Sequence, residues 1–114
     1  MASKLTPHQK ILRQVKESDW QKTVERIARF NGWMVYHAPD NKPDFRGRVQ
    51  NITAGFPDLV LVKNGTLIFA ELKSETGKTS VEQNNWLDAI SACEVLTFVW
   101  RPSNIDEVRS FLER

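Results

Sequence analysis

Two carboxylates and a lysine fall on one face of a predicted β-hairpin and could together form a catalytic site. Asn64-Gly65 separates two apolar, β-branched runs, and this dipeptide favours a two-residue type I′ turn. If the residues that flank the turn pair with each other, counting outward along both strands places Asp58 opposite Glu71. The alternation of pair types makes them a non-hydrogen-bonded pair, with Cβ atoms about 4.5 to 5.5 Å apart. Lys73 projects from the same face, because side chains along a strand alternate with a period of two.

Like charges directly opposite each other destabilise a sheet, so this hairpin needs a compensating group. A bound Mg²⁺ would supply it, since this ion accepts one or two protein carboxylates and keeps water and phosphate oxygens as its other ligands. Lys73 could then hold or deprotonate a water molecule, or offset charge on a phosphate. A buried Asp-Lys-Glu ion network at a strand end is the alternative. The combination of Pro57-Asp58, the counted hairpin and the Glu71-x-Lys73 spacing favours the metal site.

These residues resemble the motif of the PD-(D/E)xK nucleases, with Pro57-Asp58 as its first half and Glu71-Leu72-Lys73 as its second. Four segments in the right order narrow the resemblance to the VRR-NUC family, the virus-type replication and repair nucleases: Gly55 to Leu59, Ala70 to Lys73, Gly77 to Gln83 and Val99 to Pro102. The resemblance extends from about Ser18 to the C-terminus. It divides the chain into an N-terminal extension at 1–17 and a nuclease domain at 18–114.

The resemblance implies an α/β (α+β) fold, with a restriction-endonuclease-like αβββαβ core whose mixed sheet is flanked by helices. The residue pattern predicts the same order of helix, strand, hairpin, helix, strand and helix. Within the extension, Thr6-Pro7 followed by Gln9 predicts one additional short helix. The resemblance also implies that the Leu72 carbonyl joins the two carboxylates in binding one or two Mg²⁺ or Mn²⁺ ions.

One glutamine is a candidate for the catalytic set. The predicted helix from about Ser80 to Ser91 begins with a capping-box pattern at Ser80 and Gln83. The spacing of Gln83, Leu87 and Ile90 nevertheless turns Gln83 toward the sheet. Because the family carries a glutamine near the catalytic lysine at this place, the resemblance implies that Gln83 orients groups in the site.

Two residues of an earlier helix are candidates for a supporting role. Ser18 to Gln21 form a capping-box pattern that predicts the start of a helix ending at Asn31-Gly32, so capping alone would explain Gln21. The resemblance instead matches Gln21 to a polar residue near the metal. Glu25 lies one turn further on, at the right spacing for a salt bridge with Arg29, and is the second candidate for that supporting role.

The first half of the chain is basic, which suits a protein that binds nucleic acid. Residues 1–50 hold ten Lys or Arg against five Asp or Glu, although the whole chain has a net charge of only +2. Basic residues neutralise backbone phosphates while an acidic site holds a cation. Solvated helix faces are the alternative. The polar stretch from Asn41 to Ala54 predicts a long DNA-contacting loop, and the candidate DNA-binding residues are Lys42, Arg46, Arg48 and Lys78.

The composition limits the remaining classes of protein. A chain of 114 residues with 40% hydrophobic and 26% charged residues is expected to be one soluble domain. It has neither the ~20 apolar residues of a membrane helix nor a signal-peptide pattern at its start, which predicts a cytoplasmic protein that does not bind membranes. Its single cysteine, Cys93, has no disulfide partner and is expected in the core.

The sequence therefore predicts a metal-dependent DNA endonuclease. The resemblance implies a branched substrate such as a Holliday junction, a role in replication, repair or recombination, and a symmetric homodimer, because resolving a four-way junction needs two nicks. Two alternatives remain open. One is a nucleic-acid-binding module without catalysis, and the other is a docking subunit of a phage replication assembly.

Overall fold

A four-stranded mixed sheet lies at the centre of the computed structural model, which describes residues 4–39 and 54–114. The strands follow one another in the spatial order β1 (Met34–His37), β2 (Leu59–Lys63), β3 (Thr66–Leu72) and β4 (Leu96–Trp100). The first three are antiparallel, and β4 runs parallel to β3. The predicted mixed sheet is confirmed.

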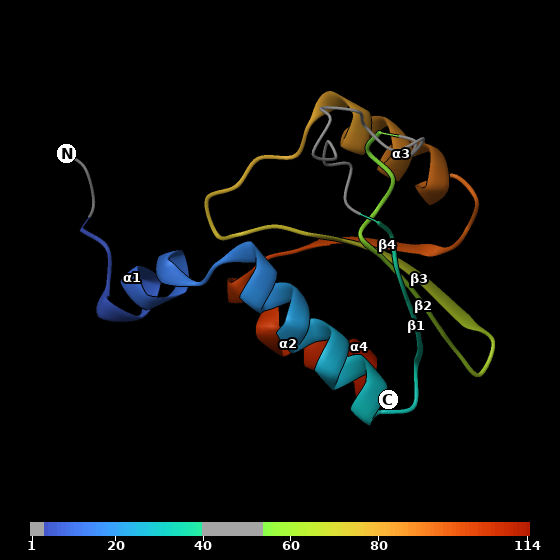
Figure 1. Cartoon of the computed structure of the whole chain (residues 1–114), viewed down its shortest axis with the longest axis horizontal. Helices are drawn as coiled ribbons and strands as arrows, with labels where there is room; N and C mark the ends of the chain where they lie inside the picture. Colours follow the sequence, from blue (N-terminus) through green and yellow to red (C-terminus); the bar gives the residue numbers. More distant parts are fainter. Residues whose placement is uncertain (1–3, 40–53) are drawn as a thin grey trace, which may run out of the picture.

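Helices cover both faces of this sheet. The described helices are α1 (Pro7–Gln14), α2 (Glu17–Phe30), α3 (Val81–Ser91) and α4 (Ile105–Leu112), with a 3₁₀ turn at Pro102–Asn104, and all but α1 pack on the sheet. Figure 1 shows α2 and α4 side by side on one face of the sheet and α3 on the other. The short α1, capped by Thr6 and Gln9 as expected, stands apart and buries none of its residues. None of the described helices combines the length and apolar character that crossing a membrane requires.

The hairpin register agrees with the sequence count. Asn64 and Gly65 both have positive φ, 46° and 79°, as a type I′ turn requires. Lys63 pairs with Thr66, and the paired positions end with Leu59 opposite Ala70. Asp58 and Glu71 are the next residues outward on the two strands.

The core lies between the sheet and the α2/α4 layer. Leu59, Leu61, Ile68, Ala70 and Leu72 are fully buried and pack with Trp20 and Val24 of α2 and with Val108 and Leu112 of α4. Two buried indoles also link these helices to the sheet. Trp20 Nε1 of α2 donates to the Trp100 carbonyl of β4, and Trp33 Nε1, just before β1, donates to the Leu112 carbonyl of α4, each at 2.9 Å. Since side chains alternate along a strand, Asp58 and Glu71 belong to the opposite face, on the side of α3.

The start of α2 differs from the prediction. The helix begins at Glu17 with Lys16 as its N-cap, and no side chain caps it, so the predicted cap at Ser18 is wrong. Glu17 and Asp19 fall in the first turn, where acidic side chains stabilise the positive end of the helix dipole. Gln21 therefore has no capping role, and Glu17 is the first residue of the helix.

Cys93 is also placed differently from the prediction. Its side chain is exposed just beyond the end of α3, with Sγ 3.5 Å from the Ala89 carbonyl. The stretch around it joins the solvent-facing end of α3 to the first residue of β4, Leu96, which is itself 37% exposed, so neither neighbour places Cys93 inside.

Candidate active site

The hairpin brings Asp58 and Glu71 together at the end of β2 and β3. Glu71 is only 1% exposed, and it is the one charged residue in the buried part of the described chain. Its Oε1 accepts a hydrogen bond from Gln83 Nε2 at 3.0 Å. Asp58 Oδ2 accepts one from the backbone N–H of Leu72 at 2.8 Å. The second Glu71 oxygen, Oε2, is buried and has no hydrogen-bond partner among the described residues.

The surroundings of Glu71 favour its protonated form. Burial away from water is the largest cause, followed by the close approach of the Asp58 carboxylate, and together they raise the pKa of Glu71 from 4.5 to about 9. Lys73 opposes this shift and Glu17 adds to it. In the absence of a cation, Glu71 therefore carries a proton at neutral pH.

A divalent cation suits this arrangement. A buried carboxylate oxygen without a partner, next to a second carboxylate, is costly unless a proton or a metal ion compensates it. Within the described ranges, no three His, Cys, Asp or Glu side chains converge into a complete metal cage. Mg²⁺ does not need one, since it binds through one or two carboxylates and takes its other ligands from water and phosphate.

Gln83 both caps α3 and contacts the carboxylate pair. Its Oε1 accepts from the Ser80 N–H at 2.8 Å, its own N–H donates to Ser80 Oγ at 3.1 Å, and its Nε2 is thereby directed at Glu71. The predicted cap and the predicted turn of Gln83 toward the sheet are thus present together. Gly55 allows this approach, because its φ is +87° and a Cβ there would lie 2.4 Å from the Glu82 carbonyl carbon.

Lys73 begins the loop that leads from β3 to α3. Its N–H donates to the Trp100 carbonyl at 3.1 Å, which fixes its backbone beside β4. Its charge lowers the pKa of Glu71, so its side chain lies close enough to act on that carboxylate. Lys78, further along the same loop, is exposed.

Arg101 holds this loop in place, a role that the sequence analysis missed. Its Nη1 donates to the carbonyls of Ser74 at 2.7 Å and Gly77 at 2.5 Å. The Ser103 N–H adds a hydrogen bond to Glu75 Oε1 at 3.0 Å. The sequence did contain a signal for Arg101, because it lies in one of the four family segments. Its position in the sequence does not, however, predict which loop its side chain contacts.

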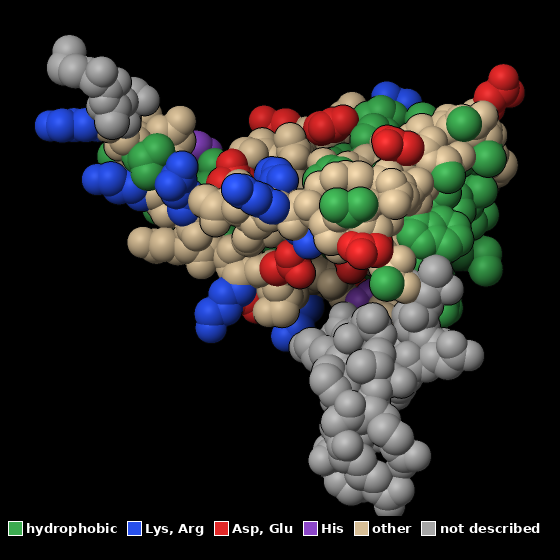
Figure 2. All heavy atoms as spheres, turned by 90° about the horizontal axis from the view of Figure 1, so that it is seen from above, with side chains coloured by type: hydrophobic (Ala, Val, Ile, Leu, Met, Phe, Trp, Pro, Cys, Tyr) green, Lys and Arg blue, Asp and Glu red, His purple; other side chains and the backbone are tan. Residues whose placement is uncertain are grey.

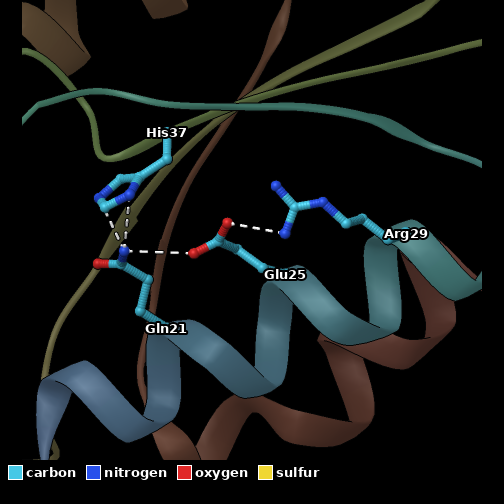
Figure 3. Close-up of polar contacts among 4 residues, drawn as sticks. All are labelled: Gln21, Glu25, Arg29 and His37. Carbon is cyan, nitrogen blue, oxygen red and sulfur yellow. Dashed lines mark hydrogen bonds and ion pairs between the residues drawn. The ribbon is translucent and has the colours of Figure 1, made fainter.

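Gln21 and Glu25 contact a histidine and an arginine rather than the carboxylate pair. Gln21 Nε2 lies 2.7 Å from His37 Nε2 and 3.3 Å from Glu25 Oε2, and Glu25 Oε1 accepts from Arg29 Nη1 at 3.1 Å (Figure 3). The predicted Glu25–Arg29 salt bridge is confirmed. His37 is close to Asp58 along the backbone, since the next N–H, of Ala38, donates to the Asp58 carbonyl at 2.8 Å.

Glu17 is the α2 residue whose charge reaches Glu71. The sequence analysis missed it because the predicted cap at Ser18 left it outside the helix. Its position four residues before Gln21, on the same side of an α-helix, could have revealed it. The remaining predicted DNA contacts, Lys42, Arg46 and Arg48, lie outside the described residues.

The mixed sheet, its helices on both faces and the carboxylates at the end of the hairpin define an α/β domain of the restriction-endonuclease-like type. Comparison with protein families is more specific, because the VRR-NUC domain matches residues 8–103. The chain belongs to the VRR-NUC family. This is a nuclease-type domain whose members generally depend on a divalent metal, and the resemblance seen in the motifs is confirmed.

Solved structures agree on the fold. One, described as a "VRR_NUC domain", aligns with a TM-score of 0.62 at 23% identity over 84% of this chain and 96% of its own. Another, a "VRR_NUC domain protein", has a TM-score of 0.63 at 17% identity over 86% of this chain and 88% of its own. At these identities the likeness shows the fold alone. No curated protein in the comparison matches the chain.

Proposed function

We propose that this protein is a metal-dependent DNA endonuclease, in which Asp58, Glu71 and the Leu72 carbonyl hold one or two Mg²⁺ or Mn²⁺ ions. The observation that carries the proposal is the buried Oε2 of Glu71, which has no hydrogen-bond partner among the described residues and belongs to a carboxylate beside Asp58. A structural ion network would be expected to satisfy that oxygen. Leu72 contacts Asp58 through its N–H, so the role of its carbonyl is proposed from the family resemblance.

A bound divalent ion would act as a Lewis acid toward the scissile phosphate and as a means of activating water. Side chains of the protein would supply the remaining functions. Lys73 positions the attacking water and offsets phosphate charge. Gln83 fixes the orientation of the Glu71 carboxylate through its 3.0 Å hydrogen bond. Gln21 and Glu25 act less directly: Glu25 contacts Gln21, and Gln21 holds His37 beside the strand that begins directly after Asp58.

Cleavage in the presence of Mg²⁺ or Mn²⁺, but not of EDTA, tests this function. Labelled branched, flap and linear DNA would be incubated with the protein under the three conditions, and a branched substrate such as a Holliday junction is expected to be cut fastest. Binding without cleavage in every metal would instead support a non-catalytic nucleic-acid-binding module. The absence of both binding and cleavage would support a docking subunit of a replication assembly. A cytoplasmic site of action, in a bacterial or phage-infected cell, is part of the proposal.

The basic residues Lys42, Arg46, Arg48 and Lys78 are proposed to contact the DNA backbone rather than the bases, because phosphate contacts position a protein without reading sequence. Replacing all four by Ala is expected to weaken binding to unrelated sequences equally and to flatten its salt dependence. Binding titrations at several salt concentrations check this. An unchanged slope would mean that these residues do not touch DNA.

The proposal also includes a symmetric homodimer, since each chain supplies one carboxylate pair and a four-way junction needs two symmetric nicks. Sedimentation at micromolar concentration, with and without junction DNA, is expected to show a species of twice the monomer mass. A monomer under both conditions would contradict this part of the proposal and leave the nuclease assignment intact.

A further inference from the structure

Phe30, the last residue of α2, is 90% exposed, more than any other large apolar side chain in the described ranges. Trp20, Val24 and Ala28 form the stripe of α2 that faces the core. Phe30 follows Ala28 by two residues, about 200° further around the helix axis, and its 90% exposure shows that it does not join that stripe. The side chain therefore belongs to the outward face of the helix and takes no part in the core.

Three cations share this outward face. Lys22, Arg26 and Arg29 have the i, i+4, i+7 spacing of one helix face and are all exposed. Together with Glu25 and Phe30 they line an open groove of about 570 Å³. The three cations span about 10 Å along the helix axis, at ~1.5 Å per residue.

The acidic residue of the groove does not cancel its positive character. Glu25 is held inward, with a side chain only 13% exposed, and its two oxygens accept from Arg29 and Gln21 (Figure 3). The side chain of Arg29 remains 60% exposed. An approaching anion thus meets the cationic ends of three side chains before it meets the carboxylate.

The outward surface of α3 would repel nucleic acid. Figure 2 shows acidic side chains over the α3 face and lysine and arginine side chains toward α1. The outward residues Glu82 and Asp88 of α3 and Glu94 beyond it are all exposed, and residues 80–94 contain no Lys or Arg. This distribution of charge directs a polyanion to the α1/α2 side.

We propose that the outward groove of α2 binds single-stranded DNA, with Lys22 and Arg26 contacting successive phosphates and Phe30 stacking on an unpaired base. A cationic groove that follows the backbone, together with an aromatic platform, is the general pattern of single-strand binding. Stacking on Phe30 requires an exposed base face, which the bases inside a duplex do not offer. The inference rests on the proposed nuclease function and extends it, because α2 begins at Glu17, whose charge acts on Glu71, and continues for about 20 Å to Phe30. The preferred substrate of the nuclease would then carry a single-stranded arm.

Fluorescence anisotropy in EDTA separates this inference from catalysis. The probes are a labelled duplex with a single-stranded tail of ten thymidines and the same duplex with blunt ends. Phe30→Ala is expected to weaken binding of the tailed duplex roughly tenfold and to leave the blunt duplex unchanged, while Phe30→Trp keeps the affinity for the tail. Val81→Ala, at a residue 70% exposed on the acidic α3 face, is the matched control and should change neither.

Salt titrations test the cations. Lys22→Ala and Arg26→Ala should each reduce the slope of log K against log salt for the tailed duplex by about 0.7. Equal affinity of Phe30→Ala and the parent for the tailed duplex would overturn the inference, and so would an equal loss for both probes. A change in sedimentation of Phe30→Ala without a change in DNA binding would also overturn it, because Phe30 would then be a protein contact. None of these readings depends on cleavage.

Discussion

Asp58→Asn is expected to abolish metal-dependent cleavage while leaving the metal-free protein at least as stable as the parent. The asparagine keeps the shape of the side chain and an oxygen that can accept the Leu72 N–H, which lies 2.8 Å from Asp58 Oδ2. It also removes the charge that opposes ionisation of Glu71, so the metal-free variant no longer depends on the Glu71 proton to avoid two adjacent negative charges. Loss of one carboxylate also removes a ligand from the proposed cation site. Activity and metal-free stability should therefore respond in opposite directions.

Thermal melts of the parent and Asp58→Asn, in EDTA and with Mg²⁺ or Mn²⁺, measure this. A ligand that binds only the folded state stabilises it by mass action, so the metal should raise the melting temperature of the parent more than that of the variant. Asp106→Asn, at an exposed residue in the first turn of α4, is a control that should preserve cleavage. If Asp58 instead formed a structural ion pair with Lys73, the variant would lose about 3 kcal/mol or more of stability and would still cut DNA.

The metal-free protein is also expected to lose stability as the pH rises from about 4.5 to about 9, the ordinary and the raised pKa of Glu71. Between these values the folded protein keeps a proton on Glu71 that the unfolded chain has released. The stabilisation from that proton is complete below about 4.5 and is lost as the pH rises through about 9. One proton corresponds to a slope of up to about 1.4 kcal/mol per pH unit.

Urea unfolding in EDTA at several pH values provides the measurement, with Glu71→Gln as the test variant. The amide stays neutral, so this contribution to the slope should vanish, and subtracting the two curves removes the effect of every other titrating group. Glu82→Gln, an exposed neighbour on α3, should follow the parent. Parallel curves for the parent and Glu71→Gln would mean that Glu71 is ionised in the folded protein without metal.

The same proton makes metal binding depend on pH. Glu71 must lose it before both of its oxygens can accept a cation, so the affinity for Mg²⁺ or Mn²⁺ should increase as the pH rises. The metal-free protein is thus more stable with Glu71 protonated, whereas the metal-bound protein needs Glu71 ionised beside Asp58. Burial of Glu71 lowers the affinity for the cation at neutral pH, and it keeps the metal-free site from holding two adjacent negative charges.

The sequence by itself determined the hairpin and the pairing of its carboxylates. Asn64-Gly65 fixes the turn, and strict alternation then fixes every opposed position out to Asp58 and Glu71, because a slip of one residue would move the apolar side chains out of the core. The cap of α3 could also be predicted from the sequence, because it joins Ser80 and Gln83, which are only three residues apart. Such features depend on dihedral angles and neighbours along the chain, which the sequence displays directly.

The tertiary structure alone decided how these residues are surrounded. The burial of Glu71, the reach of Gln83 from α3 and the hold of Arg101 on the loop after Lys73 each join elements that are distant in sequence. The capping pattern at Ser18 was wrong, since α2 begins at Glu17 without a side-chain cap. A capping pattern describes only neighbours along the chain, so the helix start that lets the charge of Glu17 act on Glu71 was decided by the folded structure.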